Sequence, residues 1–182
     1  MKPQVVLFIC LLYIMLMACN NSESKFNDEI SKQASEQPGI NAGANKFTIT
    51  TPAGWKRLDT TDNGVKITYL LSPMDAGENK ARINVITTST VDVTLDSIIN
   101  ENILYMSKHL KKFNEKGIGN QNINGIYVKW LKYSVGSDSR DYKLYILIKN
   151  GVAYYITCSV AKNEIKKYQV DIDEAVNSFT TN

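Results

Sequence analysis

Hydrophobic and polar residues alternate along most of the chain after residue 46, which is the pattern of β-strands. The alternating segments are rich in β-branched and aromatic residues, which strands favour. Asn124-Gly125 and Asn150-Gly151 are dipeptides typical of tight hairpins and separate consecutive segments. We therefore predict about seven strands, at residues 47–50, 65–72, 81–88, 113–118, 126–135, 141–149 and 152–160.

Two further segments place apolar residues at helical spacing. The first, residues 95–112, has an apolar stripe that begins at Leu95, follows Thr94 as a candidate N-cap and ends among lysines. The second is predicted at about residues 164–179, with Asn163 as its candidate cap. The strand at 126–135 is apolar on both faces, so we expect helices to cover both sides of the sheet. The predicted fold class is α+β, an antiparallel sheet flanked by two helices.

The first 19 residues have the features of an export signal. Lys2 precedes an apolar run from Val5 to Met17, which is shorter than the roughly 20 residues of a membrane-spanning helix. The sequence Leu16-Met17-Ala18-Cys19 resembles the lipobox of bacterial lipoproteins. This resemblance implies that signal peptidase II cleaves between Ala18 and Cys19, and that acyl chains such as palmitate anchor Cys19 to the bilayer.

The composition divides the rest of the chain in two. Residues 19–45 follow the signal peptide (1–18) and are rich in Asn, Ser, Gln, Glu and Gly, so they bury little apolar surface, and we predict a flexible tether. Residues 46–182 form the predicted domain. Asn20 follows the candidate acylated cysteine, and in a Gram-negative host a residue other than Asp there favours the outer membrane.

The folded part resembles a known family. The segments FTITTPAGW, NINGIYVKWLKYSV, GVAYYITCSV and IDEAVNSF are similar in order and spacing to PsbP-like domains across roughly residues 46–180. The resemblance implies an antiparallel sheet in an α/β/α sandwich and a non-catalytic binding or assembly role. Residues 20–45 do not match the N-terminal segment with which PsbP docks on photosystem II, so the photosystem role does not transfer.

Composition and charge exclude several chemistries. The formal charge of +3 argues against a nucleic-acid binder, and one histidine with three cysteines argues against zinc and disulfide scaffolds, so we expect no metal or other cofactor. Residues 59–64 resemble a calcium loop, but Leu70 stands where a glutamate is needed, which favours a polar turn. For the carboxylates near 171–174, the sequence favours a solvated helix face.

Other side chains have a structural and a functional interpretation. His109 is interpreted as a surface residue rather than a catalytic base, and Cys158 as a buried small hydrophobe rather than a nucleophile. Lys108, Lys111, Lys112 and Lys116 form a modest basic cluster that suits anionic lipid or an acidic partner. The last three long strands are crowded with tyrosines, and we predict a docking surface at Tyr133, Tyr142 and Tyr145.

These features predict a membrane-anchored envelope lipoprotein that is monomeric, is not an enzyme and binds or stabilises a protein partner. An alternative is a carrier or sensor of a small apolar ligand, which requires a cavity of about 300 Å³ or more. A third alternative is an envelope hydrolase that uses His109 or Cys158. We expect no nucleic-acid partner.

Overall fold

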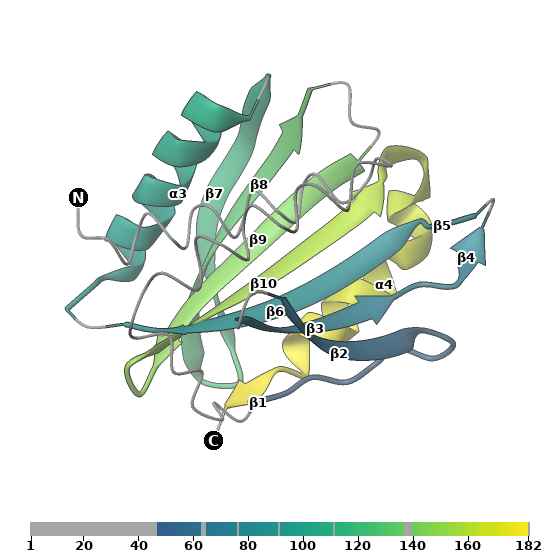
Figure 1. Ribbon diagram of the computed structural model, residues 1–182, viewed down its shortest axis with the longest axis horizontal. Coiled ribbons are helices and arrows are strands. Elements are labelled where there is room, and N and C mark those ends of the chain that lie inside the picture. Colours follow the sequence, from purple (N-terminus) through teal and green to yellow (C-terminus); the bar gives the residue numbers. More distant parts are fainter. Residues whose placement is uncertain are drawn as a thin grey trace.

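The protein is described by a computed structural model that covers residues 47–62, 65–75, 77–90, 92–110, 112–136 and 140–181. Its centre is a seven-stranded antiparallel sheet with the strand order β2-β3-β6-β10-β9-β8-β7 (Figure 1). The predicted signal peptide, Cys19 and the predicted tether lie outside the described residues. The strands of the sheet are β2 (Lys56–Asp62), β3 (Val65–Leu71), β6 (Ala81–Ser89), β7 (Phe113–Ile123), β8 (Ile126–Val135), β9 (Arg140–Lys149) and β10 (Val152–Ala161).

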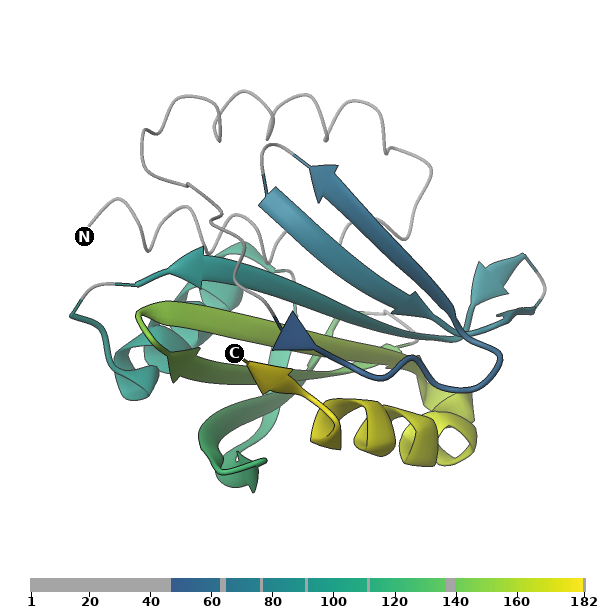
Figure 2. The same cartoon turned by 90° about the horizontal axis from the view of Figure 1, so that it is seen from below.

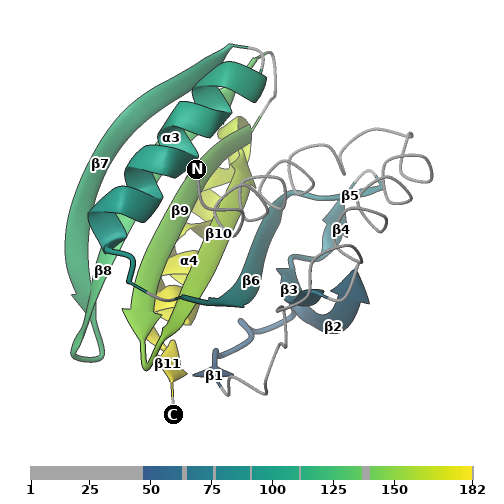
Figure 3. The same cartoon turned by 60° about the vertical axis from the view of Figure 1, so that its left-hand side comes forward.

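Two helices cover opposite faces of this sheet (Figures 2 and 3). Helix α3 (Leu95–His109) packs over β7, β8 and β9, and helix α4 (Ile165–Asn177) packs over β10. Alternation along β9 explains the two cores, since Leu144 and Ile146 belong to the core under α3 while Leu147 belongs to the core under α4. The predicted α+β fold class and α/β/α sandwich are confirmed.

The helix termini differ in how they are capped. The Thr94 side chain accepts a hydrogen bond from the backbone N–H of Ser97, and the Ser97 hydroxyl accepts one from the N–H of Thr94. This reciprocal pair fixes the start of α3. By contrast, a short 3₁₀ turn, η1 (Lys162–Glu164), leads from β10 into α4, and no side chain caps α4. The predicted cap at Asn163 is therefore wrong.

Two predictions about the ends of the sheet need correction. The strand predicted at 47–50 is the short β1 (Phe47–Thr48), which pairs with β11 (Thr180–Thr181) outside the main sheet. The segment interpreted as a polar turn contains Asp59 to Asp62, which belong to edge strand β2. Strand β2 is exposed along most of its length and so lacks the alternation that marks a strand. Asp59 accepts hydrogen bonds from Arg57 and Thr68 within this sheet.

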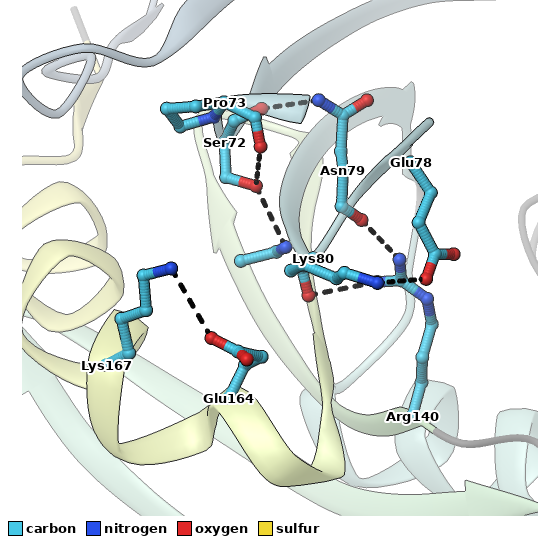
Figure 4. A network of polar contacts seen from close by, with 9 residues as sticks. Ser72, Pro73, Glu78, Asn79, Lys80, Arg140, Glu164 and Lys167 are labelled. Carbon is cyan, nitrogen blue, oxygen red and sulfur yellow. Dashed lines mark hydrogen bonds and ion pairs between the residues drawn. The ribbon is translucent and has the colours of Figure 1, made fainter. Parts of the chain in front are cut away.

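A buried arginine fastens a small hairpin to the sheet. The hairpin comprises β4 (Met74–Asp75) and β5 (Glu78–Asn79). Arg140, only 7% exposed, donates to the backbone carbonyls of Asn79 and Lys80 (Figure 4). Ser72 adds a hydrogen bond of 3.0 Å from the N–H of Ala81 to its hydroxyl. The hairpin therefore depends on side chains because its own ladder is only two residues long.

Candidate functional site

A pocket of about 170 Å³ lies between α4 and the sheet, towards the β7 edge. Strands β7, β8 and β9 each contribute one lysine to its lining: Lys116, Lys132 and Lys143. Strand β10 contributes Cys158 and Val160, and α4 contributes Ile165 and Ile172. The pocket thus combines a cationic side on the sheet edge with an apolar side under the helix.

The three lysines are not equally neutralised. Lys116 forms an ion pair of 2.6 Å with Asp141 on β9. Lys132 and Lys143 lie directly opposite each other on β8 and β9, so their side chains share one face. Among the described residues, neither has a carboxylate oxygen within 4.0 Å of its ammonium group. The pocket therefore holds an excess of positive charge.

Burial makes the charge on Lys143 less favourable than usual. Desolvation lowers the pKa of Lys143, and the like charge of Lys132 lowers it further. Asp173 on α4 acts in the opposite direction but does not outweigh these two effects. Asp173 also accepts a hydrogen bond of 2.7 Å from Gln169 on the same helix. The carboxylate of Asp173 therefore offsets the positive charge of the lysines only in part.

Aromatic rings contact the ammonium groups of both lysines. The Nζ atom of Lys143 lies 4.4 Å from the ring centre of Tyr145 and 5.1 Å from that of Trp130. The Nζ atom of Lys132 lies 5.6 Å from the Trp130 ring. An ammonium group within about 6 Å of an aromatic centroid is attracted by the ring quadrupole. Each of the two ammonium groups therefore has at least one favourable aromatic contact.

The deep part of the pocket is neutral. Cys158 is 3% exposed, as predicted for a small buried hydrophobe. Burial raises the pKa of the Cys158 thiol to about 12, so the sulfur stays protonated at physiological pH. A protonated thiol is a poor nucleophile, and here it forms part of an apolar lining.

The predicted tyrosine docking surface is wrong. Tyr133, Tyr142 and Tyr145 are 0%, 3% and 1% exposed, because these strands lie inside the sheet and are covered on both faces. The rings of Tyr133 and Tyr142 stack with their centres 5.1 Å apart in the core under α3. Tyr142 and Tyr145 instead contribute to the lining of the pocket, and Tyr133 does not.

Among the described residues, an exposed tyrosine and an exposed isoleucine lie at the sheet edge, on the side that carries α3. Tyr127 of β8 is 51% exposed and Ile118 of β7 is 42% exposed. Between them, the side-chain amide of Asn120 donates a hydrogen bond of 2.6 Å to the Tyr127 hydroxyl. We call these three residues the edge patch. Tyr127 follows the Asn124-Gly125 turn by two residues, a position that could have identified it from sequence as lying at a strand end.

The two residues considered for a hydrolase mechanism, His109 and Cys158, lie in different parts of the fold. His109 is exposed at the end of α3 and stacks on Tyr105 with ring centres 4.1 Å apart. Cys158 belongs to the core on the other face of the sheet, under α4. The sheet therefore separates the two residues that would have to meet in a nucleophile–base pair.

Two carboxylates of α4, those of Asp171 and Asp173, accept hydrogen bonds from other side chains. Asp171 accepts a hydrogen bond of 3.0 Å from the indole N–H of Trp55, and Asp173 accepts one from Gln169. Across the residues that the structure describes, no three His, Cys, Asp or Glu side chains gather as a metal ion would require. Within the same residues, neither helix is long and apolar enough to cross a membrane.

The pocket does not provide the site that an apolar carrier needs. Its volume of about 170 Å³ is below the roughly 300 Å³ of a typical ligand site, and three lysines line it. A ligand of this pocket would be smaller than a drug-sized molecule and would carry negative charge.

Comparisons with known proteins identify the fold alone. No protein family and no curated protein sequence matches the chain. A cyanobacterial PsbP (CyanoP) from Synechocystis sp. PCC 6803 is 16% identical, with a TM-score of 0.54 over 81% of this chain and 99% of its own. LpqN of Mycobacterium tuberculosis, described as involved in cell envelope biogenesis, is 13% identical, with a TM-score of 0.58 over 80% and 89%.

A third similar structure has no established role. It is a protein of unknown function from Pseudomonas aeruginosa, described as a candidate regulator, with 12% identity and a TM-score of 0.55 over 75% of this chain and 96% of its own. Together these structures show that the chain has a PsbP-like fold. At such low identity they assign no activity to it.

Proposed function

We propose that the chain is a lipoprotein of the bacterial cell envelope, anchored through acylated Cys19, whose domain binds and stabilises a protein partner without catalysing a reaction. The lipobox-like sequence Leu16-Met17-Ala18-Cys19 supports the anchor. Two or more acyl chains would hold the protein on the bilayer durably, since one chain alone binds only marginally. In a Gram-negative host, Asn20 favours the outer membrane. The PsbP-like fold shared with LpqN is consistent with an envelope location.

The edge patch is the observation that carries the proposed binding role. Other aromatic side chains of the central strands are buried or partly buried, whereas Tyr127 and Ile118 are about half exposed on neighbouring strands. Tyrosine combines a large apolar area with a polar end and is enriched at protein interfaces. The patch also includes residues of β7, which pairs only with β8 among the described strands. One side of β7 can therefore accept a strand from a partner.

The separation of His109 and Cys158 supports a role without catalysis. A hydrolase mechanism would need Cys158 as nucleophile close to His109, or to another group, as base. The raised pKa of Cys158 and its burial remove it further from nucleophilic chemistry.

Site-specific photocrosslinking in native membranes tests this proposal. A benzophenone amino acid replaces Tyr127 or Ile118 in the full-length chain, and the matched control replaces Leu58, which is 43% exposed on β2 at the opposite edge. We expect both edge-patch positions to crosslink the same protein and Leu58 to crosslink none of it. We also expect Cys19→Ala to remove the crosslink from the membrane fraction.

Two results would contradict the proposal. One is equal crosslinking from Leu58, which would indicate random collisions at the membrane surface. The other is an edge patch that crosslinks only to a second copy of this chain or to nothing, since a partner that covers Tyr127 has to lie within reach of the probe.

A further inference from the structure

The cationic pocket carries an inference that does not depend on the proposed partner binding. Lys132 and Lys143 are paired directly across two strands. Like charges at such positions destabilise a sheet. The arrangement is therefore energetically unfavourable, and an anion placed between the two ammonium groups would relieve the repulsion.

The carboxylates near the pocket do not neutralise the positive charge of Lys132 and Lys143. Asp141 is paired with Lys116, and Asp173, which accepts a hydrogen bond from Gln169, offsets the charge of Lys143 only in part. The ammonium group of Lys143 lies over the rings of Trp130 and Tyr145, and that of Lys132 lies over Trp130, rather than beside a carboxylate. Two neighbouring ammonium groups, neither with a carboxylate oxygen within 4.0 Å among the described residues, favour an oxygen anion.

The opposite side of the pocket favours an apolar group on the same ligand. Ile165 and Ile172 of α4 and Val160 of β10 line it, together with the neutral thiol of Cys158. The volume of about 170 Å³ equals that of about five or six water molecules at roughly 30 Å³ each. That space accommodates a short aliphatic chain or a single ring.

We propose that this pocket binds a small organic monocarboxylate. Its carboxylate lies between the ammonium groups of Lys132 and Lys143, and its aliphatic or aromatic stem packs against Ile165 and Ile172. A carboxylate has two oxygens and can accept one charged hydrogen bond from each lysine. Burial of the stem against α4 adds the hydrophobic contribution that a bare ion such as phosphate lacks.

Isothermal titration calorimetry on the full-length chain in detergent micelles tests the site. The probe is phenylacetate, and phenylacetamide serves as its neutral analogue of nearly equal size. The variants are Lys143→Gln and Lys132→Gln. Lys149→Gln is the matched control, because Lys149 is exposed on the same strand as Lys143 but lies outside the pocket lining. Both pocket variants are expected to fold, since each removes one of two repelling charges.

The expected result is binding of phenylacetate but not of phenylacetamide. Each pocket variant should weaken that binding by about tenfold or more, the usual effect of losing a charged hydrogen bond, and Lys149→Gln should leave it unchanged. Equal binding of the amide would overturn the proposal, as would an equal loss in Lys149→Gln. Inorganic phosphate that binds as tightly as phenylacetate would overturn the role of the stem and indicate a general anion site.

Discussion

The indole of Trp130 on β8 fills the space that a side chain at Gly119 on β7 would occupy. A Cβ atom at Gly119 would lie 2.7 Å from the indole Cε2 atom, closer than such atoms approach in proteins. The same indole lies within 5.6 Å of both Lys132 and Lys143. The absence of a side chain at one edge position thus lets Trp130 lie where it can order the cations of the pocket.

A double-mutant cycle tests this relationship. Gly119→Ala forces the indole to move, and we expect it to lower the free energy of unfolding by about 1–3 kcal/mol, as overpacking usually does. In a Trp130→Ala background the clash is absent, so Gly119→Ala should be nearly neutral. Urea unfolding of the four proteins measures the coupling. Additive effects in the two backgrounds would show that the indole does not depend on Gly119.

Arg140 is expected to matter more for stability than an exposed arginine. Arg140→Ala leaves the carbonyl of Asn79 without its charged donor and empties a buried position, so we expect a loss of about 2–3 kcal/mol. Arg57→Ala is the matched control, because it breaks an exposed ion pair with Asp59 and should cost less than about 1 kcal/mol. Chemical denaturation compares the two variants. Hydrogen exchange in β4 and β5 should accelerate only in Arg140→Ala.

The reciprocal hydrogen bonds between Thr94 and Ser97 at the start of α3 are expected to contribute less to stability than Arg140 does. Thr94→Ala removes the acceptor for the Ser97 N–H, which is 3.1 Å from the Thr94 hydroxyl, and we expect a loss of about 1 kcal/mol. Thr94→Ser keeps the hydroxyl and should stay close to the wild type. Thermal unfolding distinguishes the two, and an equal loss in both variants would assign the effect to the threonine methyl group instead.

The interior of the fold is predictable from sequence because its strands and helices bury one or both faces. Strand β8 was predicted with its observed bounds, and β3, β6, β9 and β10 were each predicted within about one residue. Helix α3 follows from its apolar stripe and from Thr94. The exposed edges carry no such signal. Strand β2 faces solvent along most of its length, so its polar residues resemble a loop.

The candidate site is less predictable for a different reason. Lys132 and Lys143 belong to different strands, and only the observed register places them opposite each other. Proximity along the chain groups Lys116 with Lys108, Lys111 and Lys112, whereas its ion-pair partner is Asp141. The exposure of tyrosines likewise depends on which strand lies at an edge. Tyr127 is exposed near the β7 edge, and Tyr145 is buried beneath α4.

The buried thiol of Cys158 predicts a specific weakness at alkaline pH. Its ordinary pKa of 9.0 is raised to about 12 in the folded protein by desolvation. The contribution of this group to stability is therefore complete below pH 9 and is lost as the pH rises from about 9 towards 12, because only the unfolded chain ionises readily there. Buried tyrosines such as Tyr145, whose pKa is also raised, add to the loss at somewhat higher pH.

Substitutions that cannot ionise separate this effect from packing. Cys158→Ala and Cys158→Ser should differ from each other in stability at pH 7, because one loses volume and the other buries a hydroxyl. Both should nevertheless show a flatter decline in the free energy of unfolding between about pH 8.5 and 10 than the wild type does. Urea unfolding at a series of pH values measures these slopes. If the wild type and both variants decline in parallel, Cys158 ionises as easily in the folded chain as in the unfolded one. The apolar lining around Cys158 would then have to be more hydrated than its burial indicates.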